Sequence, residues 1–356
     1  RKGAFMQFEK KVLSNGVRAI VVPIPHSLTM TVLVLVSAGS EYETEKRNGI
    51  SHYLEHMCFK GTTRRKTAQE INEEIAMLGG FSNAFTDTEC TGYYARANSE
   101  YFLHVLNIVS DMFCNPTLPD TEIEKERGVI IQEICGYEDN PQYLVGNLFT
   151  RLLYGDQPAG RNILGTRETV SSFTRDHLLA YRQEHYTASS TAVVVSGNFE
   201  RATNVWGEID RAFTDVPSGI CLQKQPVLVS QEAPRLSVVY KDVNQTNLVL
   251  GFPAYHFFHD KITALSVLSV ILGGGMSSRL FDKIREEMGA AYYIYSHNNP
   301  STDHGNFMCC AGVDSARIEE VVRAILNEIK RIKEQAISGR ELLKAQNSIV
   351  GNLFAG

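Results

Sequence analysis

The chain has 356 residues, of which 43% are hydrophobic and 21% are charged. These proportions are typical of globular proteins, and the length predicts two domains of about 150–200 residues each. The formal net charge is −5 and no block of like charges stands out, so nothing favours a nucleic-acid partner. No segment approaches the roughly 20 apolar residues that a membrane-spanning helix needs, and no membrane role is expected.

The seven cysteines form no Cys-x-x-Cys motif and show no spacing typical of disulfide-rich proteins. Reduced thiols in a cytosol-like compartment are therefore expected. The first residues, Arg1–Phe5, lack the apolar segment of a signal peptide.

The first half of the chain predicts a mixture of strands and helices. Strands are expected at 17–22, 29–36, within 81–97 and at 191–196, with helices near 49–59, 67–78, 99–113, 120–138, 143–153 and 174–184. The helix near 67–78 begins with Thr67 and Glu70 in the form of a capping box and ends at Gly79. We assign residues 6–213 to an N-terminal domain.

A stretch rich in proline, at 214–234, reads as a linker between the two domains. The second domain, 235–356, repeats the order of elements in the first. Strands are expected at 236–240, 248–252, 291–297 and 306–312, and helices near 260–272, 277–287 and 315–334. The segment 93–113 resembles 306–329, which predicts two copies of one α+β unit. The second copy is shorter and stops inside a helical pattern, so we expect it to be incomplete at the C-terminus.

The helix near 49–59 carries the most informative pattern in the chain. Asn48 or Ser51 can cap its start, and Gly61 suits a left-handed stop. At 100° per residue, one face is apolar, and the opposite face carries His52, Glu55, His56 and Phe59.

This polar face has the chemistry of a metal-dependent hydrolase. Because residues four apart lie one above the other, His52 and His56 can bind one ion, and zinc favours neutral imidazole. Glu55 lies beside them and can take a proton from water and deliver it to a leaving amine. The alternative is a surface helix whose two histidines are four apart by chance.

A third ligand is expected from another element. One face of the helix at 120–138 interleaves Glu122, Glu126 and Glu133 with β-branched apolar residues, an arrangement that is costly to bury unless a cation is present. Glu122 is explained by its place in the first turn, near the positive end of the helix dipole. Periodicity does not choose between Glu126 and Glu133, of which one can bind the metal while the other supports a histidine.

The order His52-x-x-Glu55-His56, continued as far as Thr62, resembles the inverted zinc motif of the pitrilysin/insulinase family of peptidases. The nearest likeness is to the short bacterial members related to the β-subunit of the mitochondrial processing peptidase. The run from Glu126-Arg127 to Glu133 matches the family's downstream acidic motif. The resemblance implies one zinc ion per chain, with Glu133 as its third ligand and Glu126 in support.

Two further segments match the family. The run from Gly79 through Asn83 and Ala84 to Thr86 resembles the family's edge strand, which implies that a substrate peptide pairs with this strand. Arg285 and Tyr292 match a pair seven residues apart in active members, which implies carbonyl binding by Arg285 and oxyanion stabilisation by Tyr292 with zinc. Phe59 is a candidate wall for the substrate side chain before the cut bond, or else an ordinary core residue.

The resemblance as a whole implies an α+β fold of two homologous domains, each an antiparallel sheet covered by helices, facing each other across a cavity. It also implies a zinc metalloendopeptidase for unfolded or short peptides, working as a homodimer or as a heterodimer with a related subunit. A bacterial cytoplasmic location is expected over one like the mitochondrial matrix. The rival interpretations are a non-catalytic core subunit of a complex, and a processing-peptidase β-type subunit that needs a separate partner.

Overall fold

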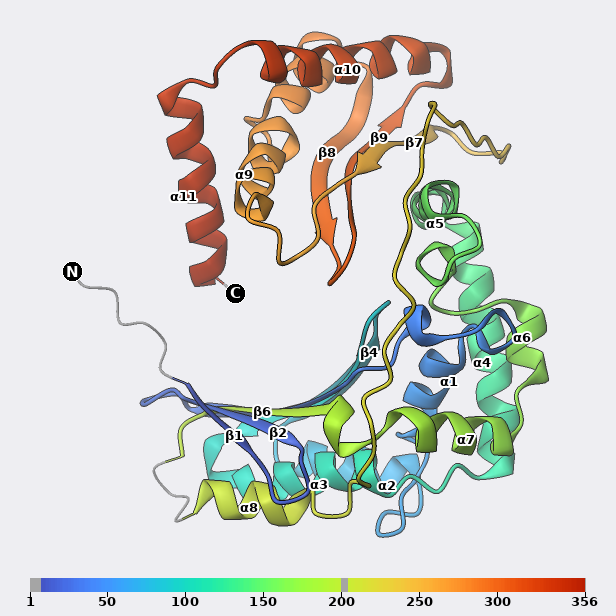
Figure 1. The fold of residues 1–356 in the computed structure, drawn as a ribbon, viewed down its shortest axis with the longest axis vertical. Helices are drawn as coiled ribbons and strands as arrows, with labels where there is room; N and C mark the ends of the chain where they lie inside the picture. Colours follow the sequence, from blue (N-terminus) through green and yellow to red (C-terminus); the bar gives the residue numbers. More distant parts are fainter. Residues whose placement is uncertain (1–7, 200–203, 356) are drawn as a thin grey trace. The chain divides into compact units, whose positions relative to one another are not determined.

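The computed structural model describes residues 8–199 and 204–355 (Figure 1). Their contacts divide the chain into two compact units. The first contains the residues up to Cys135 together with Arg161–Gln225, and the second contains Gly136–Gly160 together with the residues from Pro226 onwards. The sequence placed 136–160 in the first domain, whereas the contacts place this segment in the second unit.

The first unit is built on a six-stranded sheet. Its strands are β1 (Glu9–Val12), β2 (Arg18–Pro23), β3 (Thr29–Val36), β4 (Phe81–Thr86), β5 (Thr91–Asn98) and β6 (Thr191–Gly197), in the order β1-β2-β6-β3-β5-β4. The sheet is antiparallel except for β2 and β6, which run parallel. A strand that lies between two oppositely directed strands, as β6 lies between β2 and β3, must be parallel to one of them.

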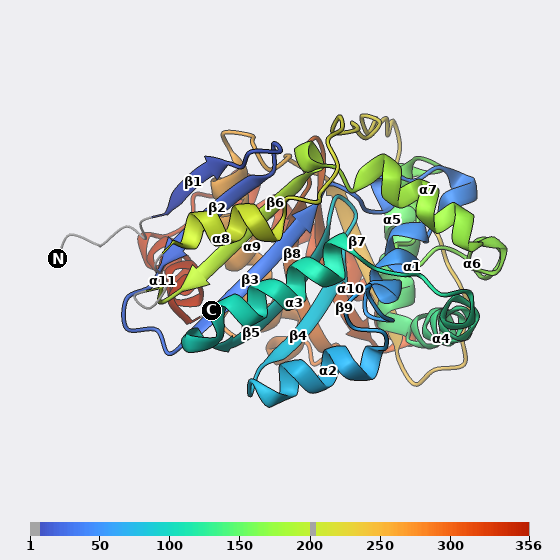
Figure 2. The ribbon, with the colours of Figure 1, turned by 90° about the horizontal axis from the view of Figure 1, so that it is seen from below.

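Helices cover this sheet on one face. The helix α3 (Phe102–Cys114) packs against β3 and β5, and α8 (Val205–Ala212) packs beside α3 (Figure 2). Alternate residues of β3, from Met30 to Val36, are almost completely buried, as the period of two in a half-buried strand requires. The helix α2 (Ala68–Met77) begins as predicted, with the Thr67 side chain accepting a hydrogen bond from the Glu70 amide.

A group of helices at one end of the sheet surrounds the candidate metal-binding helix, α1 (Ile50–Met57) (Figure 1). The others are α4 (Asp120–Asp139), α6 (Arg167–Ser172) and α7 (Arg175–His185). Two buried hydrogen bonds connect α1 to its neighbours. The Tyr53 hydroxyl donates to the carbonyl of Ile123 on α4 at 2.5 Å, and Ser51 bonds the Tyr181 hydroxyl on α7 at 2.7 Å. These bonds fix the rotation of α1 about its axis.

The second unit has a three-stranded antiparallel sheet, in the order β7-β9-β8. Its elements are α5 (Pro141–Tyr154), β7 (Thr246–Pro253), α9 (Ile262–Gly273), the π-helix Phe281–Glu287, β8 (Ala291–Pro300), β9 (Gly305–Val313), α10 (Ile318–Glu334) and α11 (Gly339–Ala355). Its core includes Leu272, Ile294, Phe307 and Ile325. The helix α5 packs against β7.

The predicted internal repeat is visible in matching elements of the two units. In each, a strand (β5 or β9) passes through one 3-10 turn into a long helix (α3 or α10). The side chains of Asn98 and Asp314 cap these turns in the same way, by accepting a hydrogen bond from the amide two residues on. Both units combine a sheet with helices, which confirms the expected α+β class.

Among the described residues, the strand β1, the α-helices α6 and α8 and the short 3-10 helices were not predicted. The predicted strand at 236–240 is wrong. This segment forms no β-pairing with the described residues, and Leu236, Val238 and Tyr240 are exposed. Its alternating apolar residues suit a strand, but without a neighbour its backbone groups gain no ladder hydrogen bonds. No helix among the described residues is both long enough and apolar enough to cross a membrane.

Candidate metal centre

The start of α1 is fixed by a glycine and by a buried carboxylate. Gly49 has φ of +94°, and a Cβ atom there would lie 2.5 Å from the carbonyl oxygen of Leu164. The Glu43 carboxylate accepts hydrogen bonds from the amides of Gly49, at 2.7 Å, and Ser51, at 2.8 Å. The sequence named Asn48 or Ser51 as the cap, which is wrong because Glu43 satisfies these donors. Burial raises the pKa of Glu43.

The two faces of α1 differ as predicted in polarity but not in exposure. The apolar residues Ile50, Tyr53, Leu54, Met57 and Cys58 are fully buried. On the opposite face, His52 is also buried, with 7% of its surface exposed, whereas Glu55 and His56 are partly buried. The turn after the helix reaches Gly61 with φ of +127°, the left-handed conformation that was expected there. The histidines therefore lie in a protected position, unlike a chance pair on a surface helix.

Three side chains from α1 and α4 converge on one point. The Nε2 atoms of His52 and His56 each lie 3.7 Å from Glu133 Oε2. The candidate ligand atoms of the three residues all lie within 4.8 Å of one another. Two ligand atoms bound to one tetrahedral zinc ion at about 2.0–2.1 Å lie roughly 3.3 Å apart. Two imidazoles and a carboxylate at these separations therefore fit a zinc ion that keeps a fourth position open.

The other candidate, Glu126, lies behind His56. Its Oε2 atom accepts a hydrogen bond from His56 Nδ1 at 3.0 Å, and its Oε1 atom pairs with Lys60 Nζ at 2.6 Å. A proton on Nδ1 leaves the Nε2 lone pair of His56 free to face Glu133. Such outer hydrogen bonds set the tautomer and orientation of metal-binding histidines. The geometry therefore supports the division of roles that the resemblance implied.

The pKa shifts of the two histidines differ in direction: that of His52 favours the neutral, metal-binding form, whereas that of His56 favours the protonated form until a metal competes for Nε2. Burial, with a smaller contribution from His56, lowers the pKa of His52 to about 3, so this imidazole is neutral at neutral pH. Burial alone would lower the pKa of His56, but the hydrogen bond to Glu126 and the nearby carboxylates raise it overall. Burial alone would raise the pKa of Glu126, but hydrogen bonds from His56 and Lys60 lower it, so it stays ionised.

One polar atom at this site lacks a partner. The Nδ1 atom of His52 is buried and has no hydrogen bond to any described residue. An imidazole that binds a metal through Nε2 carries its proton on Nδ1, and leaving a buried donor unmet costs about 1–3 kcal/mol. A buried polar group without a protein partner calls for a functional explanation, and a metal-binding role for His52 offers one.

Glu55 lies next to the candidate ligands on α1. Burial raises the pKa of its carboxyl group. The hydroxyl of Thr86, at the end of β4, donates a hydrogen bond to Glu55 Oε2 at 2.8 Å. No role for Thr86 was predicted, although Thr86 ends the strand that contains Asn83 and Ala84. Nor did the sequence predict the ion pair of Lys60, which lies just beyond the end of α1, with Glu126.

The segment with Asn83 and Ala84 forms β4, which lies at the edge of the six-stranded sheet. The Asn83 side chain accepts a hydrogen bond from the Ala84 amide at 2.9 Å. Within the described residues, β4 pairs only with β5, so its other edge offers backbone donors and acceptors. Phe59 packs against a buried cluster that includes Ile71 and Met112, as a core residue does. Its role towards substrate stays a prediction.

Arg285 and Tyr292 belong to the second unit, whereas the candidate metal ligands belong to the first. The Arg285 guanidinium lies over the ring of Phe281, 4.8 Å from its centroid. Tyr292 is 77% exposed and lies where the β8–β9 register shifts between Ala291 and Tyr293. A bulge of this kind redirects a side chain. Their catalytic roles stay predictions.

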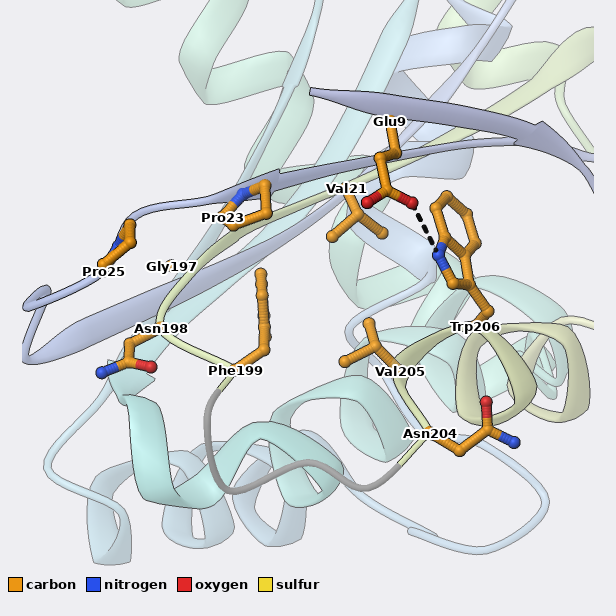
Figure 3. A pocket seen from close by; sticks show the side chains of 10 residues that line it. All are labelled: Glu9, Val21, Pro23, Pro25, Gly197, Asn198, Phe199, Asn204, Val205 and Trp206. Atoms are coloured by element: carbon orange, nitrogen blue, oxygen red, sulfur yellow. Dashed lines mark hydrogen bonds between the residues drawn. The ribbon is translucent and has the colours of Figure 1, made fainter. Parts of the chain in front are cut away.

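The first unit also has a pocket of about 420 Å³ between β2 and the start of α8 (Figure 3). Valine, proline and aromatic side chains line much of it, and Glu9 is its titratable group. The Glu9 carboxylate accepts a hydrogen bond from Trp206 Nε1 at 3.2 Å. None of the candidate ligands lines this pocket, so it offers no alternative metal centre.

Comparisons with known proteins agree with these features. Residues 20–167 match the family model "Insulinase (Peptidase family M16)", and residues 172–349 match "Peptidase M16 inactive domain". The chain is 36% identical to a Rickettsia felis protein named "Uncharacterized zinc protease", over 98% of this chain and 83% of the relative. It is 34% identical to "Uncharacterized zinc protease YmxG" of Bacillus subtilis, over 96% and 82%.

Its fold is similar to that in the crystal structure of a protease from Helicobacter pylori, with a TM-score of 0.91 and 24% identity over 98% of this chain and 85% of that one. The first family model covers His52, Glu55, His56 and Glu133, and the second covers Arg285 and Tyr292. The chain therefore belongs to peptidase family M16, the insulinase family, and its relatives include short bacterial members.

Proposed function

We propose that this protein is a zinc metalloendopeptidase that hydrolyses unfolded or short peptides. The observation that carries the proposal is the convergence of His52, His56 and Glu133 beside the carboxylate of Glu55. The relatives named as zinc proteases support the same activity. The second half matches a model described as inactive, which is consistent with candidate ligands that lie wholly in the first half.

His52 and His56 would hold zinc through their Nε2 atoms and Glu133 through its carboxylate. A bound zinc ion supplies a lowered pKa for water and polarises the carbonyl of the peptide bond. The surrounding residues prepare the ligands for this role. Glu126 keeps the His56 proton on Nδ1, and Lys60 keeps Glu126 ionised.

Glu55 performs the proton transfers. Its carboxylate takes a proton from the attacking water and then delivers it to the nitrogen of the departing amine, so the base of the first step is the acid of the second. Burial raises its pKa, which brings its proton affinity closer to the neutral range where both transfers are efficient. Its Oε2 atom is occupied by Thr86, whereas Oε1 is available for the proton.

The substrate would bind as an additional strand on β4. The unpaired edge of β4 supplies main-chain donors and acceptors, and the Asn83 side chain lies on this strand. A folded protein has few segments free to pair in this way, so unfolded or short peptides are the expected substrates. Arg285 and Tyr292 of the second unit would bind the substrate carbonyl and the developing oxyanion.

The alternatives are a non-catalytic core subunit and a subunit that needs a different partner. A non-catalytic role is disfavoured because His52, Glu55, His56 and Glu133 are all present and mutually arranged for metal chemistry. We propose that the chain functions as a pair, and size-exclusion mass with activity of the purified chain alone will distinguish a homodimer from a heterodimer.

The test is digestion of a mixed peptide library by the purified chain, with and without a chelator, read by mass spectrometry. We expect cleavage that the chelator stops and that added zinc restores. The Glu55→Gln variant should keep its zinc and lose activity by about 10²–10⁴-fold. Chelator-resistant cleavage, or full activity in Glu55→Gln, would contradict the proposed function.

A further inference from the structure

We propose that Thr86 is a positioning residue that holds the Glu55 carboxylate in place for its proton transfers. This inference rests on the proposed function, because it assigns Thr86 a role through Glu55. The Thr86 hydroxyl donates to Glu55 Oε2 at 2.8 Å, and it is the one hydrogen-bond partner of this carboxylate among the described residues. Thr86 makes this bond from β4, whereas Glu55 belongs to α1.

The hydrogen bond restricts a side chain that is otherwise free to change rotamer. Fixing a glutamate side chain costs conformational entropy, because it removes several otherwise accessible rotamers. A bond made before the substrate arrives removes this cost from the reaction. Because Thr86 occupies Oε2 alone, it orients the carboxylate while leaving Oε1 able to accept a proton.

The backbone at Thr86 is itself firmly held. Thr86 pairs with Thr91 at the end of the β4–β5 hairpin, and the Thr91 hydroxyl donates to the carbonyl of Ala38 at 2.9 Å. The turn between them closes with a bond from the Asp87 amide to the Cys90 carbonyl at 2.8 Å. Gly39 lies so close to this turn that a Cβ atom on it would be 2.3 Å from the Asp87 carbonyl oxygen.

The location of Thr86 relates the base to the proposed substrate strand. Side chains alternate along β4, so Ala84 and Thr86 share the less exposed face, while Asn83 lies on the exposed one. A peptide paired with the free edge of β4 is therefore in register with the same strand that orients Glu55. Thr86 thus sets the position of the base relative to the scissile bond, in addition to any effect on stability.

The experiment compares Thr86→Val, which keeps the shape but removes the hydroxyl, with Thr86→Ser, which keeps the hydroxyl. Each is assayed with a quenched fluorescent peptide that the wild-type chain cleaves, alongside zinc content and thermal midpoint. We expect Thr86→Val to lower kcat roughly ten- to a hundredfold, with KM changed less than twofold and zinc content unchanged. Thr86→Ser should recover kcat to within about threefold of wild type, since it restores the donor.

Thr31→Val, the same replacement in β3 of the same sheet, is the matched control and should leave kcat unchanged. Unchanged kcat in Thr86→Val, a loss confined to KM or zinc content, or equal defects in the serine and valine variants would overturn the inference. If Thr86→Val does not fold, a Thr86→Ser variant with impaired kcat overturns it equally. If the wild-type chain shows no zinc-dependent cleavage, the proposed function fails instead, which is a separate result.

Discussion

Replacement of Glu126 by glutamine tests how the first unit prepares a histidine for metal binding. The change keeps the size of the side chain and removes its charge. In the structure, Glu126 is 5% exposed and accepts from His56 Nδ1 at 3.0 Å while pairing with Lys60 at 2.6 Å. The glutamine oxygen can accept from only one of these groups at full strength, and Lys60 loses its counter-charge.

The expected loss follows from the two bonds. Mutation of groups that orient a metal-binding histidine typically weakens metal affinity by about 10–100-fold, equivalent to roughly 1.4–2.8 kcal/mol. We expect Glu126→Gln to fall in this range, because His56 loses the carboxylate that holds its Nδ1 proton. The effect on folding stability should be smaller than for a fully buried pair, because Lys60 keeps 23% of its side chain exposed.

The measurement is zinc affinity by competition with a chromophoric chelator, on metal-free protein at neutral pH. Glu122→Gln is the matched control, since Glu122 lies on the same helix and pairs only with Lys125 at the surface among the described residues. The control should bind zinc as the wild type does. An affinity of Glu126→Gln within twofold of wild type would show that Glu126 does not prepare His56, and the reasoning would be refuted.

Three further outcomes follow from the geometry. Glu133→Ala removes one of three ligands, so zinc should no longer bind at one ion per chain, and retention at wild-type affinity would exclude Glu133 as a ligand. In metal-free protein, the free energy of unfolding should fall as pH drops from about 6.5 towards 3, because His52 binds a proton in the unfolded chain but not in its buried position in the folded one. The urea midpoint should therefore fall less steeply with pH in His52→Gln than in the wild type. Equal dependence of the midpoint on pH in the two proteins would contradict this. Gly49→Ala should destabilise the fold by at least about 2 kcal/mol, because Gly49 has a positive φ and an added Cβ atom would contact Leu164. Gly128→Ala is the control and should not destabilise the fold, because Gly128 faces open space on α4. Equal urea midpoints for the two variants would show that position 49 tolerates a side chain.

Local patterns in the sequence predicted most of the helices and strands. The period of α1 and the residues around it identified a polar face with His52 and His56, because four residues are close to one helical turn. Periodicity on α4 narrowed the third ligand to Glu126 or Glu133, and the family resemblance chose Glu133. The structure supplies the physical difference, since Glu133 faces both Nε2 atoms and Glu126 faces Nδ1 of His56.

The features that were missed depend on contacts between distant segments. Glu43 caps α1 from a preceding loop, and no local signal marks a carboxylate that folds back onto later amides. Thr86 reaches Glu55 across 31 positions of sequence, so strand periodicity alone does not reveal it. The segment 236–240 has strand composition but no partner among the described residues, which shows that β-propensity without pairing does not make a strand.

The central position of β6 affects the order in which the chain can fold during synthesis. His52, His56 and Glu133 all leave the ribosome before Thr191, the first residue of β6. Until then β2 and β3 lack the neighbour that joins them, because they pair with each other only through β6. A nascent chain ending near Cys135 would thus carry the whole candidate ligand set on an unfinished sheet. An ion bound at that stage would have to be held by α1 and α4 before the strand that joins β2 to β3 exists.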